Sequence, residues 1–205
     1  MTEASAGTAS DLGGPATRRT GMRAAETVAR KQRILRATVR MAREGGYDGV
    51  QMRDVAAQAE VALGTLYRHY ASKDQLLLAV MLDQTETLRQ RLEQHPVPGG
   101  SAAERVSEVL RRACRSLERE RNVTGALVRA MFATEPEVAQ IKADVHDEMK
   151  SIIATAIGDE EANIDAVVDV LGHVWLSTMA FWVGGVSPET TMIERLTTAA
   201  HLLLR

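Results

Sequence analysis

The chain has 205 residues and a mass of 22.3 kDa, the size of one medium domain or two small ones. Hydrophobic residues make up 45% and aromatic residues only 3%, so the apolar content is aliphatic and favours packed helices over a β-sandwich. A single cysteine, Cys114, excludes an internal disulfide and a cysteine-rich zinc module. We find no apolar run of membrane-spanning length and no signal peptide, so a cytoplasmic protein without a membrane partner is expected.

Charge is distributed unevenly along the chain. The formal net charge is −2, but residues 1–75 carry +4 and residues 76–205 carry −6. The N-terminal third is therefore suited to meet an anion, whereas the acidic remainder would repel one.

The elements expected in the first third are a tail and three helices. Residues 1–23 are expected to form a disordered tail, since their first twenty positions are rich in small and polar residues. A helix is predicted from residue 24 to Gly45-Gly46, which supply a C-terminal stop. Two short apolar patterns follow, at about 51–59 and 62–69.

The remaining helices are predicted from caps and breaks. Ser72 with Gln75 and Ser101 with Glu104 form capping-box patterns that open two long helices. A short helix is predicted near Asn122 and longer ones at about 134–158 and 162–184, with a last helix after Ser187-Pro188. The result is an all-α chain of about nine helices.

The segment 51–77 carries the main functional signal. Its two short helices have apolar faces that meet at a corner near Glu60, which predicts a helix-turn-helix covered by the preceding helix. The outward side of the second short helix would then lie in the DNA major groove, and Lys73 would meet phosphate at the start of the next helix. The predicted DNA contacts are Gln51, Arg53, Gly64, Thr65, Tyr67, Arg68, His69 and Lys73.

The run from Gly64 to Tyr70, followed by Lys73 and Leu76-Leu77, resembles the signature of TetR-family transcriptional regulators. Within that family, Gly45-Gly46-Tyr47 and the run 61–68 most resemble the KstR type, repressors of sterol catabolism. The resemblance covers roughly residues 30–80 and extends faintly to 174–177 and Trp182.

This resemblance implies a DNA-binding domain at 24–71 and an effector-binding and dimerisation domain at 72–205. It implies a repressor that binds a palindromic operator as a homodimer and is released by a small hydrophobic effector of steroid or acyl-CoA type. No cofactor and no enzymatic activity are expected. Glu60 departs from the glycine that the family usually has at the corner, and a positive φ there would cost about 1 kcal/mol.

Two further sets of residues are assigned to the second domain. Bulky, adaptable side chains are candidates for an effector cavity, with ordinary core packing as the alternative for each: Met81, Met131, Phe132, Met149, Trp175, Phe181 and Trp182. Apolar stripes on the last two helices exceed what one intramolecular contact needs and predict a two-fold dimer through Val167, Leu171, Val174, Thr178, Ile193, Leu196, Ala200 and Leu203.

Three alternatives are weighed against this interpretation. His146 and His173 lack a dense set of neighbouring ligands, so no metal site is predicted, and no residue cluster indicates an enzyme. A helical ligand-binding protein without DNA-binding activity is the main alternative, because Glu60 alters the corner and the +4 charge is modest. Arg18, Arg19 and Arg23 fit an arm in the DNA minor groove and a solvated tail equally well.

Overall fold

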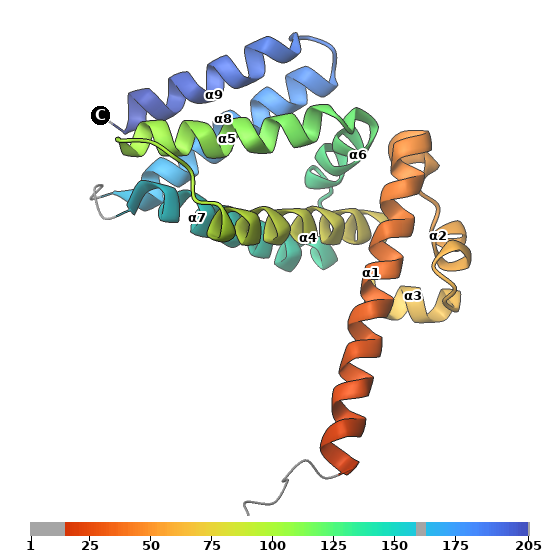
Figure 1. Ribbon diagram of the computed structural model, residues 1–205. Helices are drawn as coiled ribbons and strands as arrows, with labels where there is room; N and C mark the ends of the chain where they lie inside the picture. Colours follow the sequence, from red (N-terminus) through yellow and green to blue (C-terminus); the bar gives the residue numbers. More distant parts are fainter. Residues whose placement is uncertain (1–14, 159–162, 205) are drawn as a thin grey trace, which may run out of the picture.

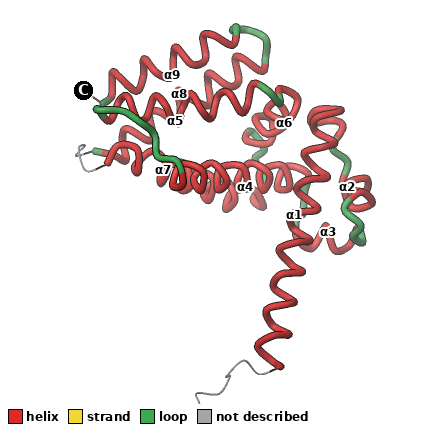
Figure 2. Tube along the Cα trace, viewed as in Figure 1, coloured by secondary structure: helices red, strands yellow, loops and turns green. Residues whose placement is uncertain are grey.

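A computed structural model describes residues 15–158 and 163–204, with side chains described for 21–158, 163–188 and 191–204. Within these ranges the chain forms nine α-helices and one 3-10 turn, without a strand (Figures 1 and 2). The all-α prediction is confirmed. The elements are α1 (Pro15–Gly49), α2 (Met52–Gln58), α3 (Leu63–His69), α4 (Lys73–Gln94), α5 (Ala102–Glu118), α6 (Arg121–Met131), η1 (Pro136–Val138), α7 (Ala139–Ile157), α8 (Ile164–Val183) and α9 (Glu189–Leu203).

Helix α1 is longer than the sequence pattern predicts. It begins at Pro15, so the tail expected over residues 1–23 is wrong for residues 15–23, while residues 1–14 lie outside the described residues. The predicted stop at Gly45-Gly46 is present as a kink, where Gly46 has a φ of 59°. Glycine adopts this conformation without the Cβ clash that other residues meet there.

Side-chain caps begin two later helices, α5 with the predicted capping box and α4 with only the Ser72 half of it, since the Gln75 side chain accepts from the Ala71 backbone instead. The Ser72 hydroxyl accepts a hydrogen bond from the Gln75 backbone N–H at 3.1 Å and opens α4. At α5 the capping box is complete, because Ser101 accepts from the Glu104 backbone and the Glu104 carboxylate accepts from the Ser101 backbone. The segment after Thr134 begins as the 3-10 turn η1 before it continues into α7.

Figure 1 shows α2 and α3 packed beside the middle of α1, with the first turns of α1 projecting beyond them. Helix α4 runs from this head into a body in which α5, α8 and α9 lie on one side and α7 lies beside α4 (Figure 2). Helix α6 stands between the body and α1.

The buried apolar side chains form two clusters. The first core unites α1, α2, α3, the first turns of α4 and one side of α6. The second core unites α5, α7, α8 and α9, and α6 contributes Val128 to it. Helix α4 passes from one to the other, since Leu76 to Val80 lie in the first core while Leu88 and Leu92 pack against the second.

Helix α8 corrects the expectation that no segment has membrane-spanning length and composition. Residues Ile164–Val183 have a mean hydropathy of 1.5, enough by length and composition alone to cross a membrane. In the fold, α8 instead supplies Leu171, Met179 and Trp182 to the second core. About a third of this window is buried in the protomer, and Val170 and Phe181 are the large hydrophobic side chains of α8 that stay exposed.

Candidate DNA-binding site and its connection to the body

The helix-turn-helix rests on a buried scaffold. Val55, Ala56 and Leu66 are at most 3% exposed, and Tyr70 closes the same cluster. The Arg33 side chain of α1 donates a hydrogen bond to the Ala59 carbonyl at 3.3 Å and holds the end of α2. Because the inward side chains are fixed in this way, the opposite side of α3 is presented to solvent.

The corner between α2 and α3 has the strained conformation that the sequence suggested. Glu60 has a φ of 55°, and among the described residues no other non-glycine residue has a positive φ. Its backbone N–H donates to the Ala57 carbonyl, which helps to hold the turn. The expected cost of about 1 kcal/mol therefore applies to this chain.

The outward side of α3 presents polar and aromatic groups at its surface. Tyr67 is 49% exposed, and Arg68 and His69 are exposed beside it in the sequence. The Arg68 guanidinium donates to the Thr65 hydroxyl at 3.2 Å, which orients both side chains. A Cβ added at Gly64 would meet nothing within 4 Å, so nothing inside the described fold requires glycine there. The space is left open on the side where a duplex would lie.

The two predicted contacts at the start of α2 differ in their local bonding. Gln51 is exposed, but its amide group donates to the Asp48 carbonyl at 2.8 Å and joins α2 to the end of α1. Arg53 is exposed in the first turn of α2.

Lys73 packs against an aromatic ring that the sequence analysis did not assign to the site. Its Nζ lies 3.9 Å from the centre of the Tyr47 ring and donates to the Tyr47 carbonyl at 3.2 Å. The Arg129 guanidinium lies 4.0 Å from the same ring, so two cations contact one tyrosine. The sequence marks Tyr47 only as part of the Gly45-Gly46-Tyr47 pattern, because its pairing with α6 depends on the tertiary fold.

The Tyr47 hydroxyl is bound to the first turn of α4. It donates to the Asp74 carboxylate, with distances of 2.8 and 3.0 Å to the two oxygens. Burial, and after it the hydrogen bond to Asp74, raises the pKa of Tyr47 to about 12. The phenol therefore stays protonated and keeps the end of α1 attached to α4.

Helix α6 holds the same end of α1 through further polar contacts. Arg43 and Glu120 form a two-pronged ion pair with distances of 2.8 and 2.7 Å, and this bond lowers the pKa of the Glu120 carboxyl. The Asn122 side chain donates to the Arg43 carbonyl at 2.9 Å. Arg129 also pairs with Asp48 at 3.2 Å.

The predicted effector residues are not brought together into one site. Met81 and Met131 lie half-buried beside the first core, whereas Met149 and Trp175 lie half-buried beside the second. Trp182 is 1% exposed within the second core. Phe132 and Phe181 are 59% and 48% exposed, so neither is enclosed within the protomer, and their contact with an effector stays a prediction.

Trp182 is also the point where α6 contacts α8. The Arg121 guanidinium lies 5.2 Å from its ring and donates to its backbone carbonyl at 3.1 Å. The indole N–H of Trp182 is buried and has no hydrogen-bond partner among the described residues. A buried donor without a partner is uncommon in folded proteins.

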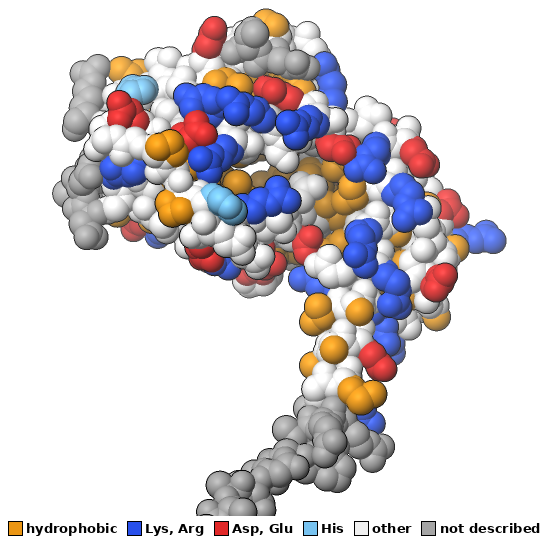
Figure 3. All heavy atoms as spheres, in the orientation of Figure 1, with side chains coloured by type: hydrophobic (Ala, Val, Ile, Leu, Met, Phe, Trp, Pro, Cys, Tyr) orange, Lys and Arg blue, Asp and Glu red, His pale blue; other side chains and the backbone are white. Residues whose placement is uncertain are grey.

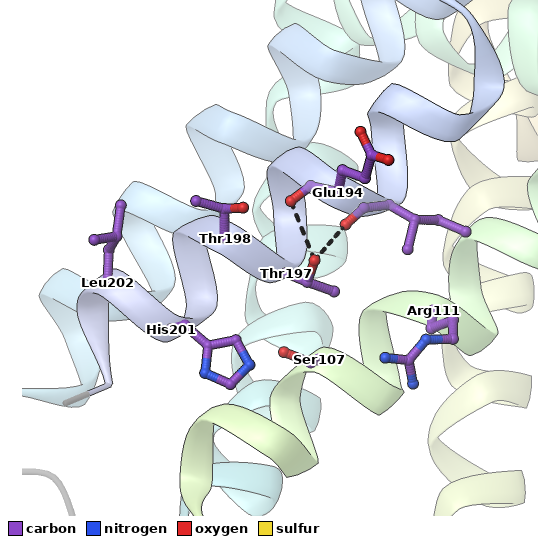
Figure 4. Close-up of a pocket in the computed structure, with 8 residues that line it drawn as sticks. Ser107, Arg111, Glu194, Thr197, Thr198, His201 and Leu202 are labelled. Atoms are coloured by element: carbon purple, nitrogen blue, oxygen red, sulfur yellow. Dashed lines mark hydrogen bonds between the residues drawn. The ribbon is translucent and has the colours of Figure 1, made fainter.

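The molecular surface is hollowed between several pairs of helices. Figure 3 shows one face hollowed between α4 and α5, with hydrophobic side chains inside and Arg side chains along α5. A second, open groove of about 510 Å³ lies between α5 and α9, where Ser107, Arg111 and His201 line it (Figure 4). A third, smaller hollow lies between α1 and α4 and is lined in part by Arg36 and Asp83.

The predicted dimer stripes point mainly inward. Five of the predicted dimer residues are at most 6% exposed within the protomer: Val167, Leu171, Thr178, Leu196 and Ala200. Their predicted place on the surface between two copies is therefore corrected to the protomer's own core. Val174, Ile193 and Leu203 are half-buried against the second core. The periodicity was recognised correctly, but it marked the intramolecular face of both helices. The outward faces instead carry Val170, Phe181 and Leu202, which are 44%, 48% and 57% exposed.

Reactive and metal-binding residues add no further site. Burial raises the pKa of the Cys114 thiol to about 12, as expected for a small core residue. His146 lies 3.7 Å from Asp169, and within residues 15–158 and 163–204 no cluster of three or more potential ligands could hold a metal ion.

Comparison with known proteins supports the arrangement described above. Residues 34–80 match the family described as "Bacterial regulatory proteins, tetR family", and residues 99–203 match "Tetracyclin repressor-like, C-terminal domain". The chain is 38% identical over 178 residues to the HTH-type transcriptional repressor KstR of Rhodococcus jostii (strain RHA1), covering 85% of this chain and 82% of that protein.

Two solved structures share this architecture. A TetR transcriptional regulator from Rhodococcus sp. RHA1 is 28% identical with a TM-score of 0.80, covering 87% of this chain and 97% of that one. Thermus thermophilus FadR, a TetR-family repressor in complex with lauroyl-CoA, is 18% identical with a TM-score of 0.69, covering 85% and 93% of the two chains.

Proposed function

This chain belongs to the TetR family of transcriptional regulators, and we propose that it is a cytoplasmic repressor that binds a near-palindromic operator as a two-fold dimer. The observation that carries the proposal is the solvent-facing group of Thr65, Tyr67 and Arg68 on α3, fixed from behind by a buried scaffold. Lys73 follows in the first turn of α4, where a cation and free backbone N–H groups favour phosphate.

The test of this proposal is binding to double-stranded DNA at several salt concentrations. We expect Tyr67→Ala to weaken operator binding while the fold stays intact. Lys73→Ala should lower affinity about equally for all DNA sequences. It should also flatten the slope of log affinity against log salt concentration (the salt slope) by about one unit. Gln58→Ala, an exposed change near the end of α2, is the control and should bind like the parent. If the parent protein prefers no duplex over random DNA, the result would instead favour a ligand-binding protein without DNA-binding activity.

The dimer contact is proposed to use the outward face of α8 and α9. Val170 and Phe181 are eleven residues apart, about three helical turns, so they lie on one side of α8. Together with Leu202 they leave apolar surface exposed on helices whose other side is already packed. A second copy of the chain would cover this face in an isologous contact.

Sedimentation at micromolar protein tests the interface. Phe181→Asp should convert a dimer into a monomer, because an unpaired carboxylate would be buried at the contact. Val186→Asp changes a 72% exposed valine in the loop after α8 and should leave the dimer intact. A parent protein that sediments as a monomer at all concentrations would contradict the proposal.

We also propose that the effector is hydrophobic and carries a carbonyl oxygen, as a steroid ketone or an acyl thioester does. Half-buried Met81 and Met131 and the hollow between α4 and α5 support an apolar ligand. The unpartnered indole N–H of Trp182 supports a ligand that supplies an acceptor. The similarly folded FadR holds lauroyl-CoA, and the cations along α5 would suit the anionic end of such a molecule.

Release from DNA is proposed to pass through α4 and α6 together. Helix α4 carries Lys73 at one end and packs against the second core at the other. Helix α6 contacts Trp182 through Arg121 and Tyr47 through Arg129, so it joins the proposed effector region to the head. A ligand with about 100-fold preference for the DNA-incompetent state would supply roughly 2.7 kcal/mol of coupling.

The effector proposal is tested with lauroyl-CoA and a neutral sterol added to the protein–operator complex. One of these should lower operator affinity in the parent, while Met131→Trp should bind DNA normally and resist release. Native mass spectrometry of the purified protein should identify a co-purifying hydrophobic molecule. Tight binding of such a molecule with unchanged operator affinity would contradict the coupling.

A further inference from the structure

The first turns of α1 form an arm that nothing in the described fold covers. Every residue from 21 to 29 is exposed, and α1 projects well beyond α2 and α3 in Figure 1. Residues 15–33 contain six basic residues and one acidic residue, Glu26. A helix in water is only marginally stable without packing, so a partner that contacts the arm would explain its length. The excess of basic residues favours a polyanion as that partner.

The side of the arm that faces the helix-turn-helix can be located from contacts farther along α1. Arg33 donates to the Ala59 carbonyl, so its side of α1 faces the end of α2. Arg30 and Arg23 are seven residues apart, close to two helical turns, so they share one side of α1. That side lies about 60–80° around the helix from Arg33 and nearly opposite Gln32. Gln32, by contrast, bonds Asp83 at 2.6 Å and marks the side of α1 that faces α4.

We propose that Arg23 and Arg30 bind DNA phosphates next to the half-site read by α3, making α1 a second DNA-contacting element. This inference rests on the proposed DNA-binding function and adds a surface to it. The distance from Arg33 to Arg23 is about 15 Å along the helix axis, which spans roughly four phosphates of one strand. Among the described residues neither Arg23 nor Arg30 forms a salt bridge, so both guanidinium groups are available.

The contact is to the backbone and not to base edges. An α-helix is about 10–12 Å wide, whereas the minor groove is about 6 Å wide, so the arm cannot enter it. The major groove at the half-site is already assigned to α3. The arm therefore lies along the phosphates, and its contribution is independent of flanking sequence but sensitive to salt and to flank length.

The experiment uses the full chain and an operator duplex selected by the parent from random-sequence double-stranded DNA. The double variant Arg23→Ala/Arg30→Ala should bind about tenfold more weakly at 0.15 M salt and flatten the salt slope by about two units. Arg23→Lys/Arg30→Lys should retain the parent slope, because the charges remain. Arg36→Ala, an exposed arginine that lines the hollow on the α4 side, is the matched control and should behave like the parent.

A second measurement separates the arm from the helix-turn-helix. Trimming the duplex to the half-sites should weaken the parent but leave the double-alanine variant unchanged. Equal losses for both proteins on trimming, or a parent-like salt slope in the double variant, would overturn the assignment of the arm. Failure of the proposed function is distinguishable, since the parent would then select no duplex and Tyr67→Ala would change nothing.

Discussion

The two hydrophobic cores differ in what they join. The second core is built within the body, from α5, α7, α8 and α9 with one valine from α6. The first core crosses from the head to the body, since Leu66 of the recognition helix and Leu127 of α6 belong to one buried cluster. The helix-turn-helix is therefore packed on part of the body and is not a separate unit with its own core.

This difference assigns distinct roles to α4 and α6. Both helices contact both cores, so a change in the second core reaches the head along two elements. Helix α4 carries the Lys73 end, whereas α6 holds the end of α1 through Arg43, Tyr47 and Asp48. A displacement of either helix relative to the other would alter the cation–tyrosine contacts between them.

The largest expected effect comes from a cavity in the first core on its α6 side. Leu127→Ala should lower the free energy of unfolding by about 2–5 kcal/mol, because Leu127 is 2% exposed and fully packed. Since the core is shared, the backbone amides of α2 and α3 should lose hydrogen-exchange protection although the substitution lies in α6. Leu196→Ala makes a similar cavity in the second core and should leave protection of α2 and α3 closer to the parent. If hydrogen-exchange protection in α2 and α3 falls equally in both variants, the claim that only the first core joins head and body would be contradicted.

Alkaline pH should weaken the first core through Tyr47. Its pKa is raised to about 12 in the fold, mainly by burial and then by the bond to Asp74, so ionisation opposes folding. The stabilisation is complete below the unfolded pKa of about 10 and is lost as the pH rises through 12. The free energy of unfolding should be measured from pH 8 to 12 for the parent and for Tyr47→Phe. The difference between the two proteins should shrink as the pH rises through this range. Tyr67→Phe controls for an exposed tyrosine, and a constant gap between parent and Tyr47→Phe would contradict the prediction.

Much of the fold could be predicted because local signals mark it directly. Caps at Ser72 and Ser101, the break at Gly46 and the apolar faces around Val55 and Leu66 each depend on neighbours within a few turns. The stripe on α8 was detected for the same reason, but periodicity shows only that a face is apolar, not which partner covers it. Val167 and Leu171 were therefore assigned to a dimer although they pack inside the protomer.

The parts of the site that were missed depend on contacts between distant segments. Arg129 and Tyr47 are 82 positions apart, and no local pattern joins them. The candidate effector residues differ widely in burial, because residue type alone does not distinguish the exposed Phe132 from the buried Trp182. The long α1 escaped detection because its first turns contain little to bury, so the composition resembled a tail.

A smaller effect is expected at the contact between α6 and the head. Arg129→Ala removes the cation over the Tyr47 ring and the ion pair with Asp48, and should cost about 1 kcal/mol because both contacts are partly exposed. Arg119→Ala changes an exposed arginine just before α6 and should be close to neutral. Thermal unfolding gives the stability difference, and high salt should reduce it. An equal response of the two variants would show that α6 holds the head by apolar packing alone.

The smallest change is expected at the corner of the helix-turn-helix, where Glu60 lies exposed in the turn between α2 and α3. Glu60→Gly should raise the free energy of unfolding by about 0.5–1 kcal/mol, because glycine adopts a φ near 55° without a Cβ clash. Glu60→Ala removes the same charge but keeps the Cβ, so it separates backbone strain from electrostatics and should not stabilise. Denaturant unfolding of the three proteins measures the difference. A stabilisation shared by Gly and Ala would assign the cost to the Glu60 carboxylate, and the corner would then carry no backbone strain.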